Sequence, residues 1–519
     1  MTGNSLDRRT VLGQAAVGTF ALALSKMALA ASAATADTVS PPKGTPFTAT
    51  NANTEAKRLA DQPFAKQTMD LPPPFNKLTY DQYRDIRFRA EKAIWKGENI
   101  DFEIQPFAMG WLYDTPVDLW LVDNGQATRL IADSNLFSFG TLIGPGPEAA
   151  PYGFSGFRIH GPINRSDVFD EYAGFQGASY FRAIGRGQSY GASARGLALS
   201  TARAEGEEFP FFRKFWIEKP KPGATQIVIH ALLDSVSTTG AYRFIIEPGL
   251  TTVMDVSATL YPRTTLTHVG IAPLTSMFLH GKSSQRLTRD YRPEVHDSGG
   301  LAMINGAGER IWRPLNNPKT LQLSAFTDRD PKGFGLWQRD RSFDTYEDLE
   351  SRYERRPSVW IQPKSGWGEG FIELIEIPVE NEIHDNVVAY WKPVQELTPG
   401  GPHVFSYKIF WGDGVPSSWA GSRVVKTRIA KGKSPDTILF VLDLTGASVK
   451  DARDLPVADV SARTGKISNV SVQRNSEISG VRVMFELTPG DAELVELRCV
   501  LKAGQQPVSE TWLYRWTKP

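Results

Sequence analysis

Hydrophobic residues alternate with polar ones, or form short β-branched runs, over most of the chain. Segments with this pattern follow one another closely: TQIVIHALLD, GAYRFIIEPG, TTVMDVSATLYPR, KTLQLSAFTD, SVWIQPK, GFIELIEIPV and NVVAYWKPV. Gly, Pro, Asp and Ser occupy the joints between them, as hairpins require. Because no alternation of strands with helices interrupts the series, a parallel α/β sheet is disfavoured. The pattern predicts an all-β protein built on a large antiparallel β-sandwich.

Two segments carry helical signals instead. In LTYDQYRDIRFRAEKAIWKG, Thr79 and Gln82 have capping-box spacing, and Gly97 is a candidate C-terminal stop. The second segment, DTYEDLESRYERRP, starts near Asp344 and ends at Pro357. We therefore expect one helix in each segment.

A candidate linker, QELTPGGPH, covers residues 395–403. About seven short strand-like segments follow it, from VFSYKIFWGD to ETWLYRWTK, over roughly 115 residues, which is typical of an immunoglobulin-like sandwich. The predicted organisation is a large β-sandwich over residues 45–394, the linker, and an immunoglobulin-like domain over residues 404–519.

The N-terminal segment, residues 1–33, reads as a targeting signal rather than as part of the fold. Arg8 and Arg9 precede a mildly apolar run from Val11 to Leu24, and small residues with two A-x-A cleavage sites follow. This pattern is typical of a twin-arginine (Tat) export signal and is too short and interrupted for a membrane span. It predicts a periplasmic protein without stable membrane insertion.

Composition narrows the possible partners. The 519-residue chain has 58 basic and 57 acidic residues and a formal net charge of +1, so nothing favours nucleic acid or an anionic membrane. Aromatics make up 11% of the chain, which suits neutral partners such as sugars but equally suits a large β-rich core. Cys499 is the only cysteine, which excludes an intramolecular disulfide, and its strand-like context predicts an inert buried residue.

Two familiar site types find little support. GQSYG, residues 187–191, matches the G-x-S-x-G pattern of a serine nucleophile, but the strand-to-helix scaffold that such an elbow needs is not predicted. The seven histidines include no pair at H-x-H or H-x-x-x-H spacing, so no metal site or other cofactor is expected.

Two aspartates stand out at predicted loop-to-strand junctions, where functional side chains are often presented. Asp385 lies in NEIHDNVVAYW and Asp297 in YRPEVHDSGGL, so that an H-D-[NS] pattern occurs twice, 88 residues apart. Either residue alone is commonly a turn or strand-end cap. Together they also suit glycoside hydrolysis, which needs one carboxylic acid for the leaving oxygen and one carboxylate for the nucleophile.

Long stretches of the chain resemble the periplasmic glucans biosynthesis proteins of types G and D. They include HGPINRSDVFDEYAGFQGASYFRAIGRGQSYGASARGLAL, RDYRPEVHDS, YERRPSVWIQP and NEIHDNVVAYWKP. The resemblance covers essentially the whole mature chain, and the twin arginines favour type D. It implies a galactose-mutarotase-like β-sandwich followed by an immunoglobulin-like domain. It further implies a role in osmoregulated periplasmic glucan synthesis, with action on the β-1,2-glucan backbone by an anomer-inverting route and a possible homodimer.

The resemblance also assigns roles to residues. Asp385 matches the general acid and Asp297 the general base, while Tyr353, Arg356 and Glu382 lie in matching motifs that shape sugar sites or relay the proton. Ile383 stands where relatives carry a small polar residue; if that residue assists the relay, its loss would favour transfer over hydrolysis. Further substrate-binding candidates are His296, Tyr180 and Trp391, and the possible aromatic platforms are Tyr180, Tyr353, Trp360, Trp367 and Trp391.

Physical chemistry adds expectations for the two carboxyl groups. Apolar neighbours such as Val387, Tyr390 and Trp391 should raise the pKa of Asp385, while Arg292 and His296 should keep Asp297 ionised. An inverting mechanism predicts a separation of roughly 6.5–9.5 Å between them.

Alternatives remain open at this point. The same cleft would serve a non-catalytic glucan-binding protein of the synthesis machinery, and a Ser189 esterase acting on glucan substituents is a third hypothesis. Neither the acceptor, water or sugar, nor the chain length follows from the residues.

Overall fold

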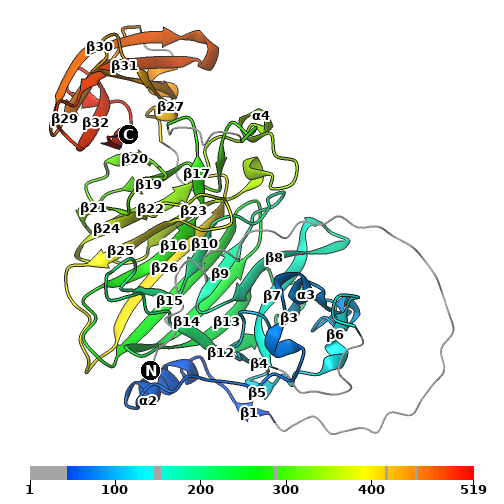
Figure 1. The fold of residues 1–519 in the computed structure, drawn as a ribbon. Helices are drawn as coiled ribbons and strands as arrows, with labels where there is room; N and C mark the ends of the chain where they lie inside the picture. The colour runs from blue at the N-terminus through cyan, green and yellow to red at the C-terminus, as the bar shows by residue number, and fades with distance from the viewer. Residues whose placement is uncertain (1–43, 145–152, 284–289, 415–418, 451–452, 519) are drawn as a thin grey trace.

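The computed structural model describes residues 44–144, 153–283, 290–414, 419–450 and 453–518. The predicted export signal, residues 1–33, lies outside the described residues. The fold is all-β, as predicted, with strands in several sheets and only short helices. Figure 1 shows a large sandwich with a smaller C-terminal domain at one end.

The first sheet of the large sandwich begins at the N-terminal end of the described chain. Its order along the hydrogen-bonded path is β1 (Thr45–Pro46), β5 (Gln126–Arg129), β4 (Asp118–Asp123), β12 (Phe211–Glu218), β13 (Ile227–Asp234), β14 (Thr238–Glu247), β15 (Thr252–Pro262), β26 (His403–Gly412), β23 (Ser358–Pro363), β22 (Gly333–Trp337), β19 (Gly300–Ile304) and β20 (Arg310–Pro314). Burial alternates strictly along β15, so one face is in the core and the other is more open.

The second sheet packs against the first, and its strand pairs are antiparallel. Its order is β21 (Gln322–Arg329), β24 (Glu369–Glu376), β25 (Val387–Pro393), β16 (Val269–Ser276), β10 (Ser193–Arg195), β9 (Tyr180–Ala183), β8 (Val168–Gln176), β7 (Phe154–Arg165) and β3 (Glu103–Ala108), with β11 (Leu197–Leu199) also on β16. Every residue of β16 is buried, because both of its faces are covered. β16 lies between β10 and β25, and this order positions the candidate site.

The main core fills the space between the two sheets. It includes a group of phenylalanines in mutual ring contact, among them Phe157, Phe175, Phe215 and Phe244, with centroid distances of 5.0–5.4 Å. Stacked and edge-to-face contacts of this kind stabilise a core beyond the area that they bury.

Short elements close the edges of the sandwich. Helix α2 (Asn51–Ala60) packs on β13, β14 and β15. Other small elements are η1 (Phe75–Lys77) and η3 (Ser134–Leu136). Two short strand pairs join β17 (Phe278–His280) to β18 (Val295–His296) and β2 (Ile86–Phe88) to β6 (Phe137–Phe139). Within the described residues, no helix is long and apolar enough to cross a membrane.

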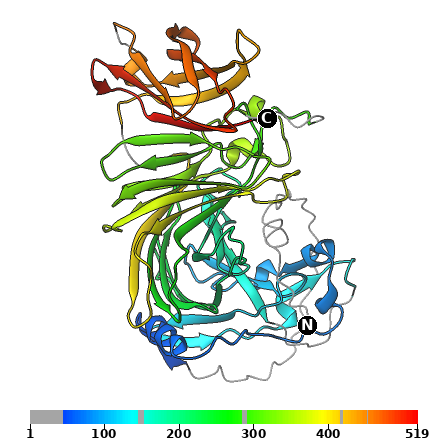
Figure 2. The same cartoon turned by 60° about the vertical axis from the view of Figure 1, so that its left-hand side comes forward.

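The C-terminal domain is a small sandwich whose core cluster continues into the large one through Ala302, Trp312, Trp337 and Trp360. One sheet is β27 (Arg423–Lys431), β28 (Ile438–Thr445), β31 (Gly480–Thr488) and β30 (Lys466–Asn475). The other layer continues the first sheet beyond β20 with β34 (Thr511–Thr517), β32 (Leu494–Ala503) and β29 (Val457–Ala462), and β33 (Gln506–Pro507) pairs with β32. Helix α5 (Ala447–Lys450) and η5 (Ser476–Ile478) are short elements of the same domain. The domain stacks on the end of the large sandwich (Figure 2), where β34 pairs in parallel with β20. Cys499 is buried in it, and burial raises the pKa of its thiol to about 12.

The predicted start of the second domain at residue 404 is wrong. β26 begins at His403, yet it pairs with β15 on one side and β23 on the other, in the middle of the first sheet. The chain therefore leaves the large sandwich only after Gly412. The Pro- and Gly-rich stretch at 395–403 is a turn between two strands of one sandwich, which composition alone could not distinguish from a linker.

Both predicted helices are also much shorter than expected. The Thr79–Gln82 capping box is present, but α3 covers only Tyr80–Arg84, and the chain continues as β2 and η2 (Ala90–Lys92) because pairing with β6 overrides helical propensity. The second segment forms α4 (Phe343–Tyr346) and η4 (Tyr353–Arg355). Between them, the Asp348 carboxylate accepts the N–H groups of Glu350 and Ser351, which offers the backbone an alternative to a helix.

Candidate active site

A cleft of about 410 Å³ is built on β8, β9 and β10 of the second sheet. Aromatic side chains form much of its lining: Phe64, Trp111, Tyr113, Tyr180, Phe209 and Phe211. Polar groups stand among them, including Glu171, Arg182 and Asp385. Aromatic faces with a few directed polar groups suit a neutral, hydroxyl-rich ligand.

Asp385 reaches this cleft from the loop that precedes β25. Its side chain is almost wholly buried, with 5% of the residue exposed. Burial raises its pKa from 3.8 to about 7, and the negative charge of Asp297 adds to the rise, while Arg182, Arg195 and Arg356 oppose it. The expected desolvation of Asp385 is confirmed, and the carboxyl group is poised to hold a proton near neutral pH.

One short segment, residues 276–278, holds both H-D-[NS] junctions. The Asn386 side chain accepts the Phe278 N–H at 2.8 Å and donates to the Phe278 carbonyl at 3.0 Å. The Ser276 hydroxyl donates to Ser298 Oγ at 2.8 Å. The Asp297 N–H donates to the Met277 carbonyl at 2.9 Å. The polar residue after each aspartate is therefore the anchor that brings two distant loops together.

Asp297 lies deeper than Asp385. It is 2% exposed, and its Oδ1 is 3.3 Å from Nη1 of Arg356. Burial raises its pKa, with Arg356 as the first opposing charge and His296 next. The expectation that Arg292 and His296 keep Asp297 ionised is wrong, because Arg356 is its ion-pair partner and burial shifts its pKa upward despite the cations.

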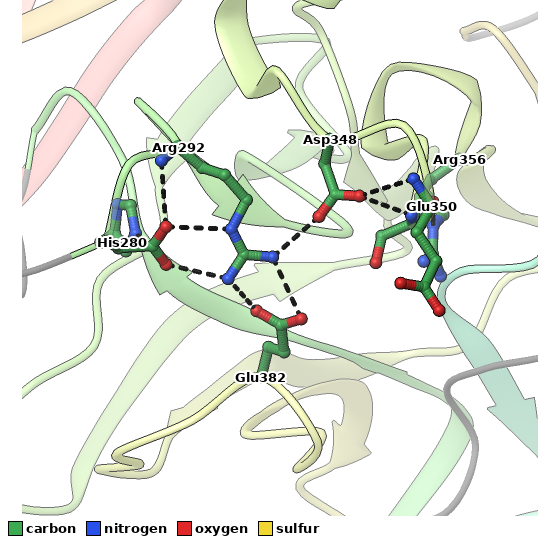
Figure 3. A network of polar contacts seen from close by, with 8 residues as sticks. His280, Arg292, Asp348, Glu350, Arg356 and Glu382 are labelled. Carbon is green, nitrogen blue, oxygen red and sulfur yellow. Dashed lines mark hydrogen bonds and ion pairs between the residues drawn. The ribbon is translucent and has the colours of Figure 1, made fainter.

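Arg292 instead joins three carboxylates (Figure 3). Its guanidinium donates to Asp290 at 2.8 and 3.0 Å, to Asp348 at 2.8 Å, and to both oxygens of Glu382. These contacts fix the loop that carries Glu382 against the segments after α4 and before β18. Glu382 keeps an electrostatic influence on Asp297 and Tyr353, whose pKa values its charge helps to raise.

The GQSYG segment supports Arg356 rather than a nucleophile. The Arg356 guanidinium donates to the Tyr190 carbonyl, and the Ser189 N–H donates to the Arg355 carbonyl at 3.0 Å. A Cβ atom on Gly191 would lie 2.9 Å from Cδ of Arg356, so glycine permits the close approach. These contacts explain the motif as packing around the cation that pairs with Asp297.

Several residues predicted to bind substrate are buried and do not line the cleft. Tyr353 is 2% exposed. The Cζ atom of Arg356 lies over its ring, 5.0 Å from the ring centroid. His296 is buried, with Nε2 2.9 Å from Glu294, so it supports the Asp297 loop instead of lining the cleft.

Of the five aromatic candidates, Tyr180 alone is among the residues described as lining the cleft. Trp391 has no exposed surface, and its assignment to substrate binding is wrong because it packs in the main core beside Trp367. Trp360 is likewise buried, at the junction with the C-terminal domain.

Comparison with known proteins identifies the family of the chain. A family model described as "Periplasmic glucan biosynthesis protein, MdoG" matches residues 47–516. The chain belongs to this family. It is similar to Glucans biosynthesis protein G of Shewanella frigidimarina, with 49% identity over 469 residues, covering 89% of this chain and 83% of the relative. The proteins of that name from Rhodopseudomonas palustris and Bradyrhizobium diazoefficiens are each 48% identical over 463 residues, covering 89% of this chain and 92% of theirs.

These periplasmic glucan biosynthesis relatives carry the type G name. The expectation of type D rests on the twin arginines, which lie outside the described residues.

The site of this glucan biosynthesis family member also contains residues that the sequence analysis missed. Trp111 and Tyr113 line the cleft and are in ring contact with each other and with Tyr80 and Tyr83, with centroids 5.0–6.0 Å apart. The available signal was the aromatic run GWLYD beside a turn, where Trp111 adopts a φ of 56°. No local sequence pattern marks Arg182 and Arg195 as site residues, because only strand pairing brings them near Asp385. Among the described residues, no group of three or more His, Cys, Asp or Glu side chains could hold a metal ion.

Proposed function

We propose that this family member is an enzyme that cleaves or transfers the β-1,2-linked backbone of periplasmic glucans with inversion at the anomeric carbon. The observation that carries the proposal is Asp385: a buried carboxyl group on an aromatic cleft, with a pKa raised to about 7 and a second carboxyl group near enough to influence it. The β-1,2 linkage comes from the family resemblance.

Asp385 takes the role of general acid. With a pKa near 7, much of it is protonated at neutral pH, and it faces the cleft where the glycosidic oxygen would lie. Proton donation to that oxygen weakens the bond to the anomeric carbon as positive charge develops on the sugar. Arg182 on the cleft wall and Arg195 beneath it would stabilise the carboxylate that remains.

Asp297 takes the role of general base. Burial raises the pKa of Asp297, and the Arg356 guanidinium opposes that rise and so favours the ionised form that a base requires. Because Asp297 is 2% exposed and is not among the cleft-lining residues, we propose that a water molecule or sugar hydroxyl carries the proton to it from the nucleophile. A sugar hydroxyl as nucleophile would give transfer or cyclisation, and water would give endo-hydrolysis.

The neutral glucan would lie along the aromatic wall. Tyr180, Trp111 and Tyr113 offer ring faces or edges to the apolar faces of glucose units. Glu171 and Arg182 provide hydrogen-bonding groups for the hydroxyls. The absence of a strong net charge on the chain agrees with an uncharged substrate.

The proposal extends to the cellular setting. We place the protein in the periplasm after twin-arginine export, and we propose a homodimer from the family resemblance. Signal-peptide fusions in a strain without the twin-arginine transporter test the export route. Light scattering of the mature chain tests the dimer.

A non-catalytic glucan-binding role is the second candidate, and the burial of Asp297 favours it, because no open path to the base is needed for binding. Wild type, Asp385→Asn and Asp297→Asn are incubated with linear β-1,2-glucan, and the products are separated by size. Glu380→Gln is the matched control, an exposed carboxylate in the loop of Asp385.

We expect product from the wild type and from Glu380→Gln and none from the two aspartate variants. Tight binding of glucan without product in any sample would move the conclusion to the binding role. Full activity in Asp385→Asn would refute the assignment of the acid.

A further inference from the structure

The guanidinium group of Arg195 is buried beneath the cleft wall. Arg195, the last residue of β10, is 2% exposed. Its Nη1 donates to Glu207 at 2.6 Å and its Nε donates to the Thr275 hydroxyl at 3.1 Å. The Thr201 hydroxyl donates to the same Glu207 oxygen at 2.7 Å. Since desolvation of both ions offsets their attraction, a buried pair like this is weak evidence for a role in stability alone.

The guanidinium lies directly behind the cleft aromatics. Its Cζ atom is 4.9 Å from the ring centroid of Tyr180 and 6.0 Å from that of Phe209, and both rings line the cleft. A cation against a ring face at this distance is attractive, most of all where water is excluded. Arg195 thus holds the position of the ring that the sequence analysis proposed as a sugar platform.

The strand order brings the same cation near the proposed acid. Ser193 of β10 lies opposite Thr275 of β16, and Thr275 lies opposite Val388 of β25. Arg195 reaches the Thr275 hydroxyl, and Asp385 lies three residues before Val388. Strand order therefore brings Arg195, at the end of β10, close to the loop that carries Asp385 into β25.

We infer that Arg195 is a positioning residue for the reaction proposed above: its guanidinium backs the Tyr180 ring and supplies a fixed positive charge beside Asp385. This inference rests on the proposed function. Arg195 does not reach the substrate, because Tyr180 lies between it and the cleft.

The other charges around Asp385 define what Arg195 adds. Asp297, after β18, and burial both favour the protonated acid, whereas Arg182 on β9, Arg195 on β10 and Arg356 after η4 favour the carboxylate. Arg182 lines the cleft and Arg356 is paired with Asp297. Arg195 is held to Glu207 beneath the wall, so its contribution stays constant during turnover. Without it, the acid would be weaker and would release its proton less readily.

The charge is tested with a variant that removes the buried pair together, Arg195→Met/Glu207→Gln, so that no uncompensated ion remains. The matched control is Arg203→Met/Glu373→Gln. This is another arginine–glutamate pair with a buried glutamate, and Nη2 of Arg203 donates to the two Glu373 oxygens at 2.8 and 3.1 Å. Carboxyl ¹³C NMR of aspartate-labelled protein follows the titration of Asp385, identified as the signal that Asp385→Asn lacks.

We expect the midpoint for Asp385 to rise by roughly half a pH unit or more in the Arg195 double variant and to stay at the wild-type value in the control. The alkaline limb of kcat/KM should move in the same direction, because the protonated acid is the active form. A wild-type midpoint in the Arg195 double variant would overturn the inference.

Arg195→Lys keeps the charge but loses the planar contact with Tyr180, and it decides the question if the double variant does not fold. We expect an unchanged midpoint for Asp385 and an affinity for linear β-1,2-glucan, measured by calorimetry, at least about threefold lower. Wild-type affinity would overturn the positioning role. Because the titration requires no turnover, it stays informative even if the wild type proves inactive, which would refute only the proposed function.

Discussion

Replacement of Asp385 by asparagine should stabilise the folded protein at alkaline pH. Burial raises the pKa of Asp385 from 3.8 to about 7, so the folded state holds a proton that the unfolded chain releases at lower pH. Protonation thus contributes stability that is fully present below about pH 4 and is lost as the pH rises through 7. Asparagine has a similar shape and carries no charge at any pH, so it avoids this loss.

The magnitude follows from the size of the shift. A rise of roughly three units corresponds to about 4 kcal/mol at 1.36 kcal/mol per unit. The advantage of Asp385→Asn should be about 2 kcal/mol at pH 5 and about 4 kcal/mol at pH 8. Activity should be lost over the same range, because the variant has no proton to donate.

Urea unfolding at pH 5 and pH 8, followed by tryptophan fluorescence, measures this difference. Glu380→Gln serves as the control and should change the free energy of unfolding by less than about 0.5 kcal/mol at both pH values, as exposed substitutions usually do. The reasoning would be refuted if Asp385→Asn and the wild type showed the same dependence of unfolding free energy on pH.

Three further predictions concern the neighbours of Asp385 and the thiol. Asp297→Asn removes a like charge and should shift the titration of Asp385 to lower pH in carboxyl ¹³C NMR, whereas an upward shift would contradict the electrostatic coupling. Arg356→Met leaves Asp297 buried without its cation and should destabilise the fold by about 3–5 kcal/mol in urea unfolding, a cost that Arg356→Met/Asp297→Asn should largely remove. Cys499 should not react with a disulfide reagent in the native protein and should react fully in denaturant, since burial raises its pKa to about 12; rapid native labelling would show that the C-terminal core is open.

The all-β class could be predicted from the sequence because alternation with a period of two is a local property. In β15, buried and partly exposed residues alternate along the whole strand, as the sequence pattern predicts. The position of β26 could not be predicted, because its partners β15 and β23 are remote in sequence and the intervening turn has the composition of a linker. The predicted helix lengths were wrong for a related reason. The capping box at Thr79 is present, but pairing of Ile86–Phe88 with another strand overrode the helical propensity of the residues after it.

The two aspartates could be singled out because each stands in the same short pattern, and the structure gives that pattern a reason. Asn386 and Ser298 anchor both loops to residues 276–278, and this anchoring requires the polar residue after each aspartate. The cations around them could not be found in this way. Arg356, Arg182 and Arg195 come from three separate segments, and Arg292, the nearer basic residue in the sequence, turns to other carboxylates.

The central claim is that Asp385 donates the proton in an inverting reaction on β-1,2-glucan. Time-resolved proton NMR of the mature protein with linear β-1,2-glucan tests it most directly, with wild type and Asp385→Asn compared under identical conditions. The account predicts that the first new anomeric signals from the wild type, whether reducing ends or new linkages, have the α configuration and that the variant produces none. New signals of β configuration, or the same signals from Asp385→Asn, would contradict it.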